Sequence, residues 1–206
     1  MAYSVEHRSF TEIRRRDRAV TDEAWIQALL HRAPFAALAT VVDGQPFINS
    51  NLFVYDEAAA CIYMHTARTG RTPDNVATSE RVCLSISEMG RLLPADVALE
   101  FSVEYSGVVV FGSATIVQDE AEASHALQLL LDKYFPHLQP GSDYRPTVPE
   151  ELARTAVYRI VIEQWSGKRK AVDADFPGAF LYGHLPAPAV RPHQSGQQCT
   201  TQEETQ

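Results

Sequence analysis

The alternation of apolar and polar residues along the chain predicts a structure built mainly of β-strands. Residues 35–42 form an unbroken apolar run of strand length, and Asp43-Gly44 after it is a hairpin-turn pair. Residues 46–55 alternate between two faces, which predicts the returning strand. Because so tight a turn joins the first two strands, we expect antiparallel pairing. Further strands are predicted at residues 61–65, 81–87, 98–117 (one or two strands) and 156–164.

Two segments have helical spacing instead. Thr21 is the predicted N-cap of a helix over residues 22–32, and Asp119 is the predicted cap of a helix over residues 120–135. With about six strands, the pattern predicts a mainly β fold with flanking helices, as a six-stranded antiparallel barrel. Closure of the barrel would remove exposed strand edges. An open sheet with helices on one face fits the same pattern.

The pattern divides the chain into three parts. Residues 1–20 form a charged N-terminal arm, whose basic run Arg14-Arg15-Arg16-Asp17-Arg18 is either a solvated segment or a ligand or partner contact. Residues 21–172 form the folded domain. Residues 173–206 form a C-terminal extension that is predicted to be disordered from about residue 187, because its Pro, Gln, Thr and Glu cannot bury enough apolar surface.

Composition limits the classes of function. The chain has 206 residues, 45% of them apolar, and a formal charge of −8, which opposes generic binding to nucleic acid but permits a local site for one phosphate. Its three cysteines have no metal-ligand or disulfide-framework spacing, and no metal site is predicted. We find no signal peptide and no apolar run of about 20 residues. These features predict a soluble cytoplasmic protein.

The segment from residue 63 to 76 carries the clearest chemistry. A strand ends at His65, Gly70 lies in a short loop, and a helix is predicted to begin at Thr72-Pro73 with Thr72 as its cap. The free N–H groups at a helix start bind anions, and guanidinium and hydroxyl groups lie beside them. A capped helix in which Arg71 pairs with Asp74 or Glu80 is the competing interpretation. The candidate phosphate ligands are Thr66, Arg68, Arg71 and Thr72.

The order of strand, His65, loop, Gly70-Arg71-x-x-Asp74-Asn75, helix and strand resembles the pyridoxamine-phosphate-oxidase-like family, which binds FMN. The branch that includes nitroimidazole-resistance proteins is the most similar one. Three further pieces agree in order and spacing, at residues 36–46, 105–114 and 157–168. The resemblance spans about residues 14–172.

This resemblance implies a split β-barrel and a homodimer with FMN at the subunit interface. It places His65, Thr66, Arg71 and Asn75 at the phosphate and ribityl chain, and Asn49, Ser50 and Asn51 along the isoalloxazine ring. Glu104, Tyr105 and Ser106 would approach from the partner subunit, and Trp165 and Lys168 would lie at the far end of the cofactor site. No basic motif for pyridoxal phosphate follows Arg169, which argues against pyridoxamine phosphate as the substrate.

Each of these residues also has a purely structural interpretation. His65 fits a satisfied structural histidine, Trp165 a core residue, and Lys168 a solvated basic run; Asn49 and Asn51 fit the exposed face of a half-buried strand.

The predicted function is an FMN-dependent oxidoreductase acting on a small organic substrate, because the sequence shows no protein nucleophile motif and a cofactor would carry the reaction. No catalytic acid or base is identified. The alternatives are a non-enzymatic flavin carrier or sensor, a haem-binding relative with His65 as axial ligand, and a cofactor-free dimeric barrel. The sequence leaves FMN, FAD and haem open.

Overall fold

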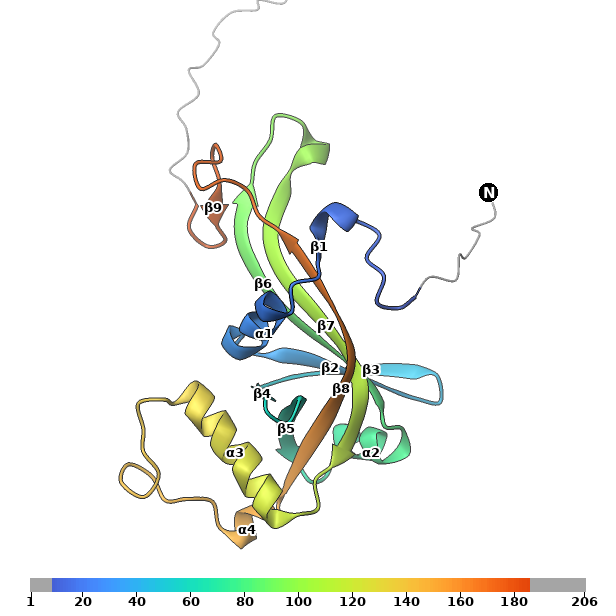
Figure 1. The fold of residues 1–206 in the computed structure, drawn as a ribbon, viewed down its shortest axis with the longest axis vertical. Helices are drawn as coiled ribbons and strands as arrows, with labels where there is room; N and C mark the ends of the chain where they lie inside the picture. Colours follow the sequence, from blue (N-terminus) through green and yellow to red (C-terminus); the bar gives the residue numbers. More distant parts are fainter. Residues whose placement is uncertain (1–8, 186–206) are drawn as a thin grey trace, which may run out of the picture.

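In the computed structural model, which describes residues 9–185, one antiparallel sheet of nine strands forms the body of the protein (Figure 1). Seven strands follow each other in the order β3-β2-β6-β7-β8-β5-β4, while β1 pairs with β8 and β9 pairs with β6. The strands are β1 (Ala19–Val20), β2 (Ala36–Val42), β3 (Gln45–Asn51), β4 (Phe53–Asp56), β5 (Cys61–Ala67), β6 (Arg81–Leu93), β7 (Ser102–Ile116), β8 (Thr155–Lys170) and β9 (Phe180–Leu181).

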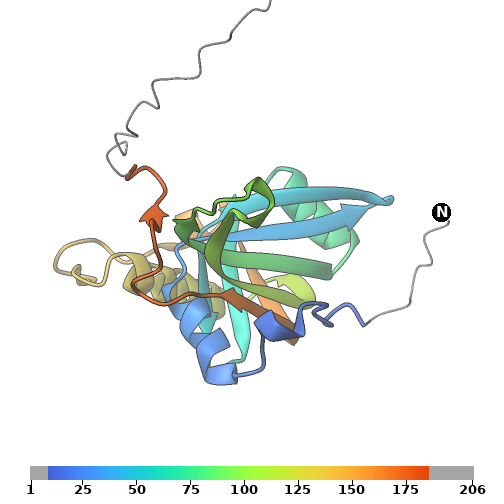
Figure 2. The same cartoon turned by 90° about the horizontal axis from the view of Figure 1, so that it is seen from above.

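The predicted antiparallel pairing is confirmed, but the predicted count of six strands is wrong. The expected return strand at residues 46–55 is two strands, since β3 pairs with β2 whereas β4 pairs with β5. Between them the Asn51 side chain accepts the N–H of Leu52 at 2.8 Å, so the ladder is interrupted there. The sheet curls strongly, as the view from above shows (Figure 2), but β3 and β4 at the two ends of its strand order do not pair, so it stays open.

Local turn chemistry explains the first hairpin. Asp43 and Gly44 have φ angles of 53° and 74°, and a two-residue turn with both angles positive matches the twist of the flanking strands. Val42 therefore pairs directly with Gln45, as the sequence predicts.

Four helices and two short 3-10 turns accompany the sheet within residues 9–185: η1 (Arg16–Arg18), α1 (Glu23–Arg32), α2 (Arg71–Thr78), η2 (Ala98–Glu100), α3 (Glu120–Tyr134) and α4 (Pro149–Leu152). Asp22 rather than the predicted Thr21 caps α1, because its carboxylate accepts the N–H groups of Ala24 and Trp25. The predicted cap of α3 is confirmed, since Asp119 accepts the N–H of Glu122 at 2.7 Å. None of these helices is long and apolar enough to cross a membrane.

The apolar core has two parts. The larger part lies between the sheet and α1 and includes Leu29, Leu84 and Tyr158; the smaller part lies between the sheet and α3 and includes Tyr63 and Leu130. Each fully buried side chain of this size stabilises the fold by about 1.5–3 kcal/mol. The two clusters fix β5 and β8, which carry the candidate site.

The arm and the extension both touch the sheet in the described residues. Ala19 in β1 pairs with Lys168 in β8, and Leu181 in β9 pairs with Arg91 in β6. The hairpin of β6 and β7 reaches away from α3 and α4 toward the upper end of the molecule, where β9 joins it (Figure 1). The disorder predicted from about residue 187 lies outside the described residues.

Candidate functional site

The loop between β5 and α2 forms one side of the candidate site. Gly70 caps α2 with a φ angle of 131°, which strongly favours glycine, and the helix begins at Arg71. The predicted cap Thr72 is therefore wrong. Its buried hydroxyl instead accepts the Asn49 side-chain amide at 3.1 Å. Pro73 is the third helical residue, where the missing N–H needs no partner within the helix.

Arg71 presents an exposed guanidinium group at this helix start. It makes no ion pair among residues 9–185, so the competing interpretation of a pair with Asp74 or Glu80 does not hold. Its guanidinium carbon lies 5.1 Å from the centre of the Phe47 ring, a cation–π contact with β3. This contact connects the start of α2 to β3.

Arg68 lies on a different side of the same loop. It lines a cavity of about 240 Å³ together with Asp119 and Leu152, toward α3 and α4. Its backbone N–H donates to the carbonyl of Arg154 at 3.2 Å. The structure therefore does not bring Arg68 together with Arg71 as a two-arginine phosphate clamp.

Asparagine side chains connect elements that no backbone ladder joins. Asn49 in β3 donates to Thr72 in α2, and Asn51 in β3 donates to the carbonyl of His65 in β5. The buried Asn75 side chain donates to the hydroxyl of Thr40 at 2.8 Å. These bonds hold β3, β5 and α2 in a fixed arrangement on the open side of the sheet.

Ser50 and Thr66 take no part in these hydrogen bonds. Ser50 is exposed and, as its neighbours in β3 alternate, points to the face opposite Asn49 and Asn51. The Thr66 hydroxyl lies 2.7 Å from that of the fully buried Tyr158 and donates to the carbonyl of Ala67.

His65 has one unused polar atom. Its Nδ1 is buried and has no hydrogen-bond partner among the described residues. Burial lowers the pKa of the imidazole below its ordinary value of 6.5, so the ring is neutral at pH 7. Buried polar atoms usually have partners, so this nitrogen lacks a hydrogen bond that such an atom normally makes.

The second set of predicted residues lies at the other end of β8. His65 pairs with Val157 near the start of β8, and Lys168 lies eleven residues further along that strand. At roughly 3.3 Å per residue the two positions are about 36 Å apart along the curved strand. A single chain therefore does not bring the two sets together. The second set is Glu104, Tyr105, Ser106, Trp165 and Lys168.

Glu104 in β7 connects to β6 and to the segment that follows β8. Its carboxylate makes a two-point ion pair with Arg91, at 2.8 and 3.0 Å, and accepts the N–H of Val172 at 2.9 Å. The Arg91 guanidinium, together with the backbone N–H groups of Val172 and Arg91, lowers the pKa of Glu104 to about 2. Arg91 also donates to the carbonyls of Asp173 and Ala174, so this pair anchors the C-terminal extension.

Tyr105 lies between two cations. The Lys168 ammonium is 5.5 Å from its ring centre, and the Arg18 guanidinium donates to its hydroxyl at 3.4 Å. Burial raises the pKa of the Tyr105 phenol, but Arg18 and Lys168 more than offset burial, and the pKa lies below its ordinary value. Ser106 pairs with Arg169 and lines a cavity of about 210 Å³ beside Tyr105.

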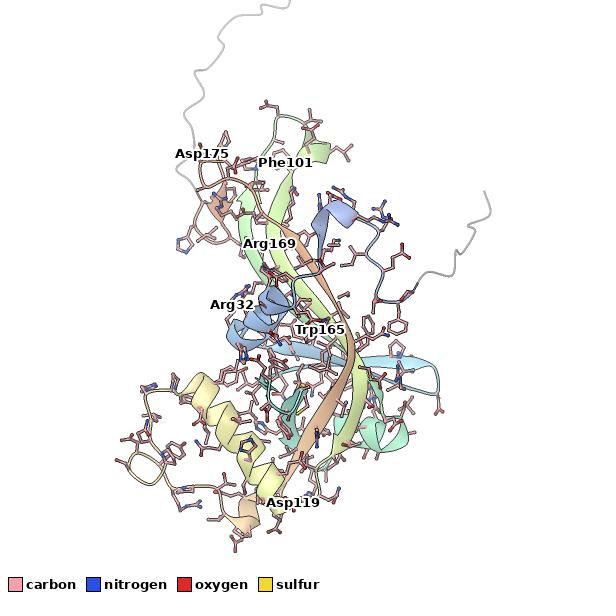
Figure 3. All side chains as sticks on the ribbon, in the orientation of Figure 1. Arg32, Phe101, Asp119, Trp165, Arg169 and Asp175 are labelled. Atoms are coloured by element: carbon pink, nitrogen blue, oxygen red, sulfur yellow. The ribbon has the colours of Figure 1, made fainter. Side chains whose placement is uncertain are left out.

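Trp165 packs against the larger core cluster, in agreement with its structural interpretation. It also lines two cavities, of about 470 and 360 Å³, which it shares with Thr11 of the arm. Figure 3 labels Trp165 in the middle of β8.

Four contact residues were missed by the sequence interpretation: Arg18, Thr40, Phe47 and Tyr158. Two of them could have been found from the sequence: Phe47 shares a strand face with Asn49, and Arg18 belongs to the basic run of the arm. Thr40 and Tyr158 could not, because each lies within an apolar strand.

Comparisons with known proteins indicate the family and the fold. The sequence matches the family model described as pyridoxamine 5'-phosphate oxidase over residues 22–169, while a search of curated proteins gave no match. Among solved structures, the flavocytochrome Anf3 from Azotobacter vinelandii is similar with a TM-score of 0.70 and 25% identity, covering 91% of this chain and 92% of that one.

Two further structures share the fold. The FAD and haem binding protein from Mycobacterium smegmatis has a TM-score of 0.67 and 21% identity, covering 87% of this chain and 94% of that one. A protein from Bacteroides thetaiotaomicron, named for 5-nitroimidazole antibiotic resistance, has a TM-score of 0.61 and 17% identity, covering 73% and 86%. The mainly β split-barrel prediction is confirmed, and the chain belongs to the pyridoxamine 5'-phosphate oxidase family.

Proposed function

We propose that the protein is a cytoplasmic FMN-dependent oxidoreductase that acts on a small organic substrate. The observation that carries this proposal is the exposed, unpaired guanidinium of Arg71 at the start of α2, within the described residues. A cation beside free helix N–H groups fits a phosphate. Family membership and the similarity to a flavocytochrome and a FAD-binding protein support a flavin as the molecule that carries this phosphate.

The residues present fit a flavin in charge and in hydrogen-bonding capacity. Arg71 and the first N–H groups of α2 would hold the phosphate. Asn49 and Asn51 fix the distance between β3 and the β5–α2 loop, so the site is formed before the ligand arrives. The unpartnered Nδ1 of His65 is available to a polar group of the ligand. A bound flavin supplies two-electron transfer between a nicotinamide donor or substrate and an acceptor.

We propose a homodimer in which each site uses both ends of the molecule. Lys168 lies about 36 Å from the position of His65 along β8 at roughly 3.3 Å per residue, and a second copy would bring Tyr105 and Lys168 to the site. Apolar surface is available for such contact. Ile48 in β3 is 64% exposed, and Val109 and Phe111 on the outer face of β7 are only half-buried.

A haem-binding relative is the second candidate. Two of the similar structures combine a flavin with a cytochrome or haem function by name, and this chain covers about nine-tenths of each. The neutral imidazole of His65, with its unpartnered nitrogen, is suited to an axial ligand.

The first test is the visible absorption spectrum of the purified protein, recorded before and after loading with FMN and desalting. The proposal predicts retained flavin bands that bleach when a nicotinamide donor is added without oxygen and return with an acceptor. Retained flavin without turnover would support a carrier or sensor. A Soret band that is lost in His65→Ala would support haem, and a protein that retains no flavin would refute the proposal.

A further inference from the structure

The fold brings two basic segments together that are about 150 residues apart in the sequence. The short strand β1 pairs with β8, with Ala19 opposite Lys168, and this places η1 against the end of β8. Figure 3 labels Arg169 on this part of β8. We call the cations of these two segments the basic arm patch: Arg14, Arg15, Arg16 and Arg18 in and before η1, and Lys168 and Lys170 at the end of β8.

The charges of the basic arm patch are largely uncompensated. Asp17 pairs with Arg15 through two short bonds of 2.9 and 2.6 Å, and lies 3.8 Å from Arg18. Within residues 9–185, neither Arg14, Arg16 nor the two lysines make an ion pair. The chain has a formal charge of −8, so its acidic side chains outnumber its basic ones and a shortage of carboxylates does not explain the unpaired cations. Because like charges repel at close range, such a cluster indicates an anionic ligand.

A cavity adjoins the basic arm patch. It measures about 210 Å³, and its lining includes Tyr105, Lys170 and Arg169. Two carboxylates also line it, but each is paired: Glu88 lies 2.9 Å from Arg32, and Glu104 lies 2.8 Å from Arg91. The charge that remains at the cavity is therefore positive. A cavity of this size holds part of a ligand, such as a phosphate group with its sugar, and leaves the rest outside.

We propose that the basic arm patch binds the diphosphate group of a nucleotide. A diphosphate matches cations that extend from the arm onto β8, whereas one phosphate would meet only some of them. Nucleic acid is disfavoured, because the overall negative charge repels an extended phosphate backbone. The four arginines and Lys170 lie outside residues 22–169, which match the family model.

This inference rests on the proposed function in one respect. The nucleotide serves the flavin reaction, either as a dinucleotide electron donor or as the adenosine diphosphate half of FAD. The shared chemistry is the diphosphate, and the experiment separates the two sources.

The test is isothermal titration of the purified full-length protein with ADP, pyrophosphate and adenosine. Wild-type protein is expected to bind ADP and pyrophosphate, more weakly as salt is added, and not adenosine. The double variant R14Q/R16Q changes two exposed side chains and is expected to bind both at least about tenfold more weakly. The matched control R81Q changes an exposed arginine paired with Glu163 and is expected to bind like wild type.

The source is assigned by releasing the bound flavin and identifying it by mass spectrometry. If FAD is the source, R14Q/R16Q loses FAD but retains FMN, and ADP binds only to flavin-free protein. If a donor is the source, flavin content is unchanged and NADPH reduces the flavin more slowly in the variant.

Two results would overturn the inference: no binding of ADP or pyrophosphate at millimolar concentration by either the flavin-loaded or the flavin-free protein, or equal binding by R14Q/R16Q and R81Q. A colourless protein that still binds ADP through these arginines would refute the flavin proposal and support this one.

Discussion

The two ends of β8 use their polar side chains in opposite ways. Around the start of β8, the amides of Asn49, Asn51 and Asn75 are bonded within the chain, which leaves open mainly Arg71 and one nitrogen of His65. Around its end, η1 contacts β8, and neither Arg16 nor Lys168 makes an ion pair among the described residues. The first end is a candidate site with few free groups, and the second is an accumulation of charge.

This difference predicts different sensitivities. A preformed hydrogen-bonded site with few free groups loses much of its affinity when one of those groups is removed. An exposed charge cluster loses affinity in small steps and depends strongly on ionic strength.

The largest expected effect is at the first end. Arg71→Ala removes the exposed cation at the start of α2 and is expected to weaken flavin binding by about 100-fold, the value of a strong charge-assisted contact. Flavin retained after desalting measures this effect. The control Arg81→Ala, another exposed arginine, should retain flavin like wild type; equal loss in both variants would remove Arg71 from the site.

Near the end of β8, the ion pair between Glu104 and Arg91 links β7 to β6 and contributes to the stability of the fold. Glu104→Gln weakens the bonds to Arg91 and Val172 and should lower the free energy of unfolding by about 2 kcal/mol, or the Tm by roughly 4–8 °C. Thermal unfolding followed by circular dichroism measures the change. Arg145→Gln, which removes an exposed pair with Glu151, is the matched control.

The same carboxylate gives a pH dependence of known sign. The pKa of Glu104 in the folded state is about 2, below its ordinary value of 4.5. Its contribution to stability is therefore complete above pH 4.5 and is lost as the pH falls from 4.5 toward 2. In that window Glu104→Gln should show a smaller decrease of Tm than wild type; an identical decrease in both proteins would contradict the assignment.

A smaller loss of stability is expected when the buried bond between α2 and β2 is removed. Asn75→Ala leaves the buried hydroxyl of Thr40 without its partner and should cost about 1.5 kcal/mol of folding free energy. Thermal unfolding and flavin affinity should fall together, since α2 is positioned by this bond. Thr78→Ala, an exposed change on the same helix, should alter neither; loss of stability with unchanged flavin affinity would show that α2 is positioned otherwise.

The smallest effect is expected at the surface. Arg145 and Glu151 are paired at 2.6 Å, but both side chains are more than half exposed. Arg145→Gln should change the free energy of unfolding by less than about 0.5 kcal/mol, because solvent screens such pairs. A larger loss in urea denaturation would mean that the α4 region contributes more to the fold than its contacts indicate.

Local signals made the turn at Asp43-Gly44 and the cap at Asp119 predictable, since each depends on residues next to it in the sequence. The start of α2 was not predictable in the same way. Thr72 has the chemistry of a cap, but Asn49 from another strand takes its hydroxyl, and Gly70 provides the turn.

The site was predictable only where one segment forms it. The β5–α2 loop and the helix start after it lie within a dozen residues, so Arg71 could be named from that segment, whereas His65 was named only from the family resemblance. Arg18 meets Tyr105 only because β1 pairs with β8, which no pattern in a two-residue strand predicts. The opposite faces of Asn49 and Ser50, in contrast, follow from strand alternation alone.

The central claim is that a flavin binds between the two ends of β8 supplied by two copies of the chain. Native mass spectrometry of the flavin-loaded protein tests it most directly. The account predicts a species with two chains of 22.9 kDa and two flavins, which Arg71→Ala converts to a flavin-free dimer. A single chain that retains one flavin would contradict it, because one chain cannot bring both ends to the same ligand.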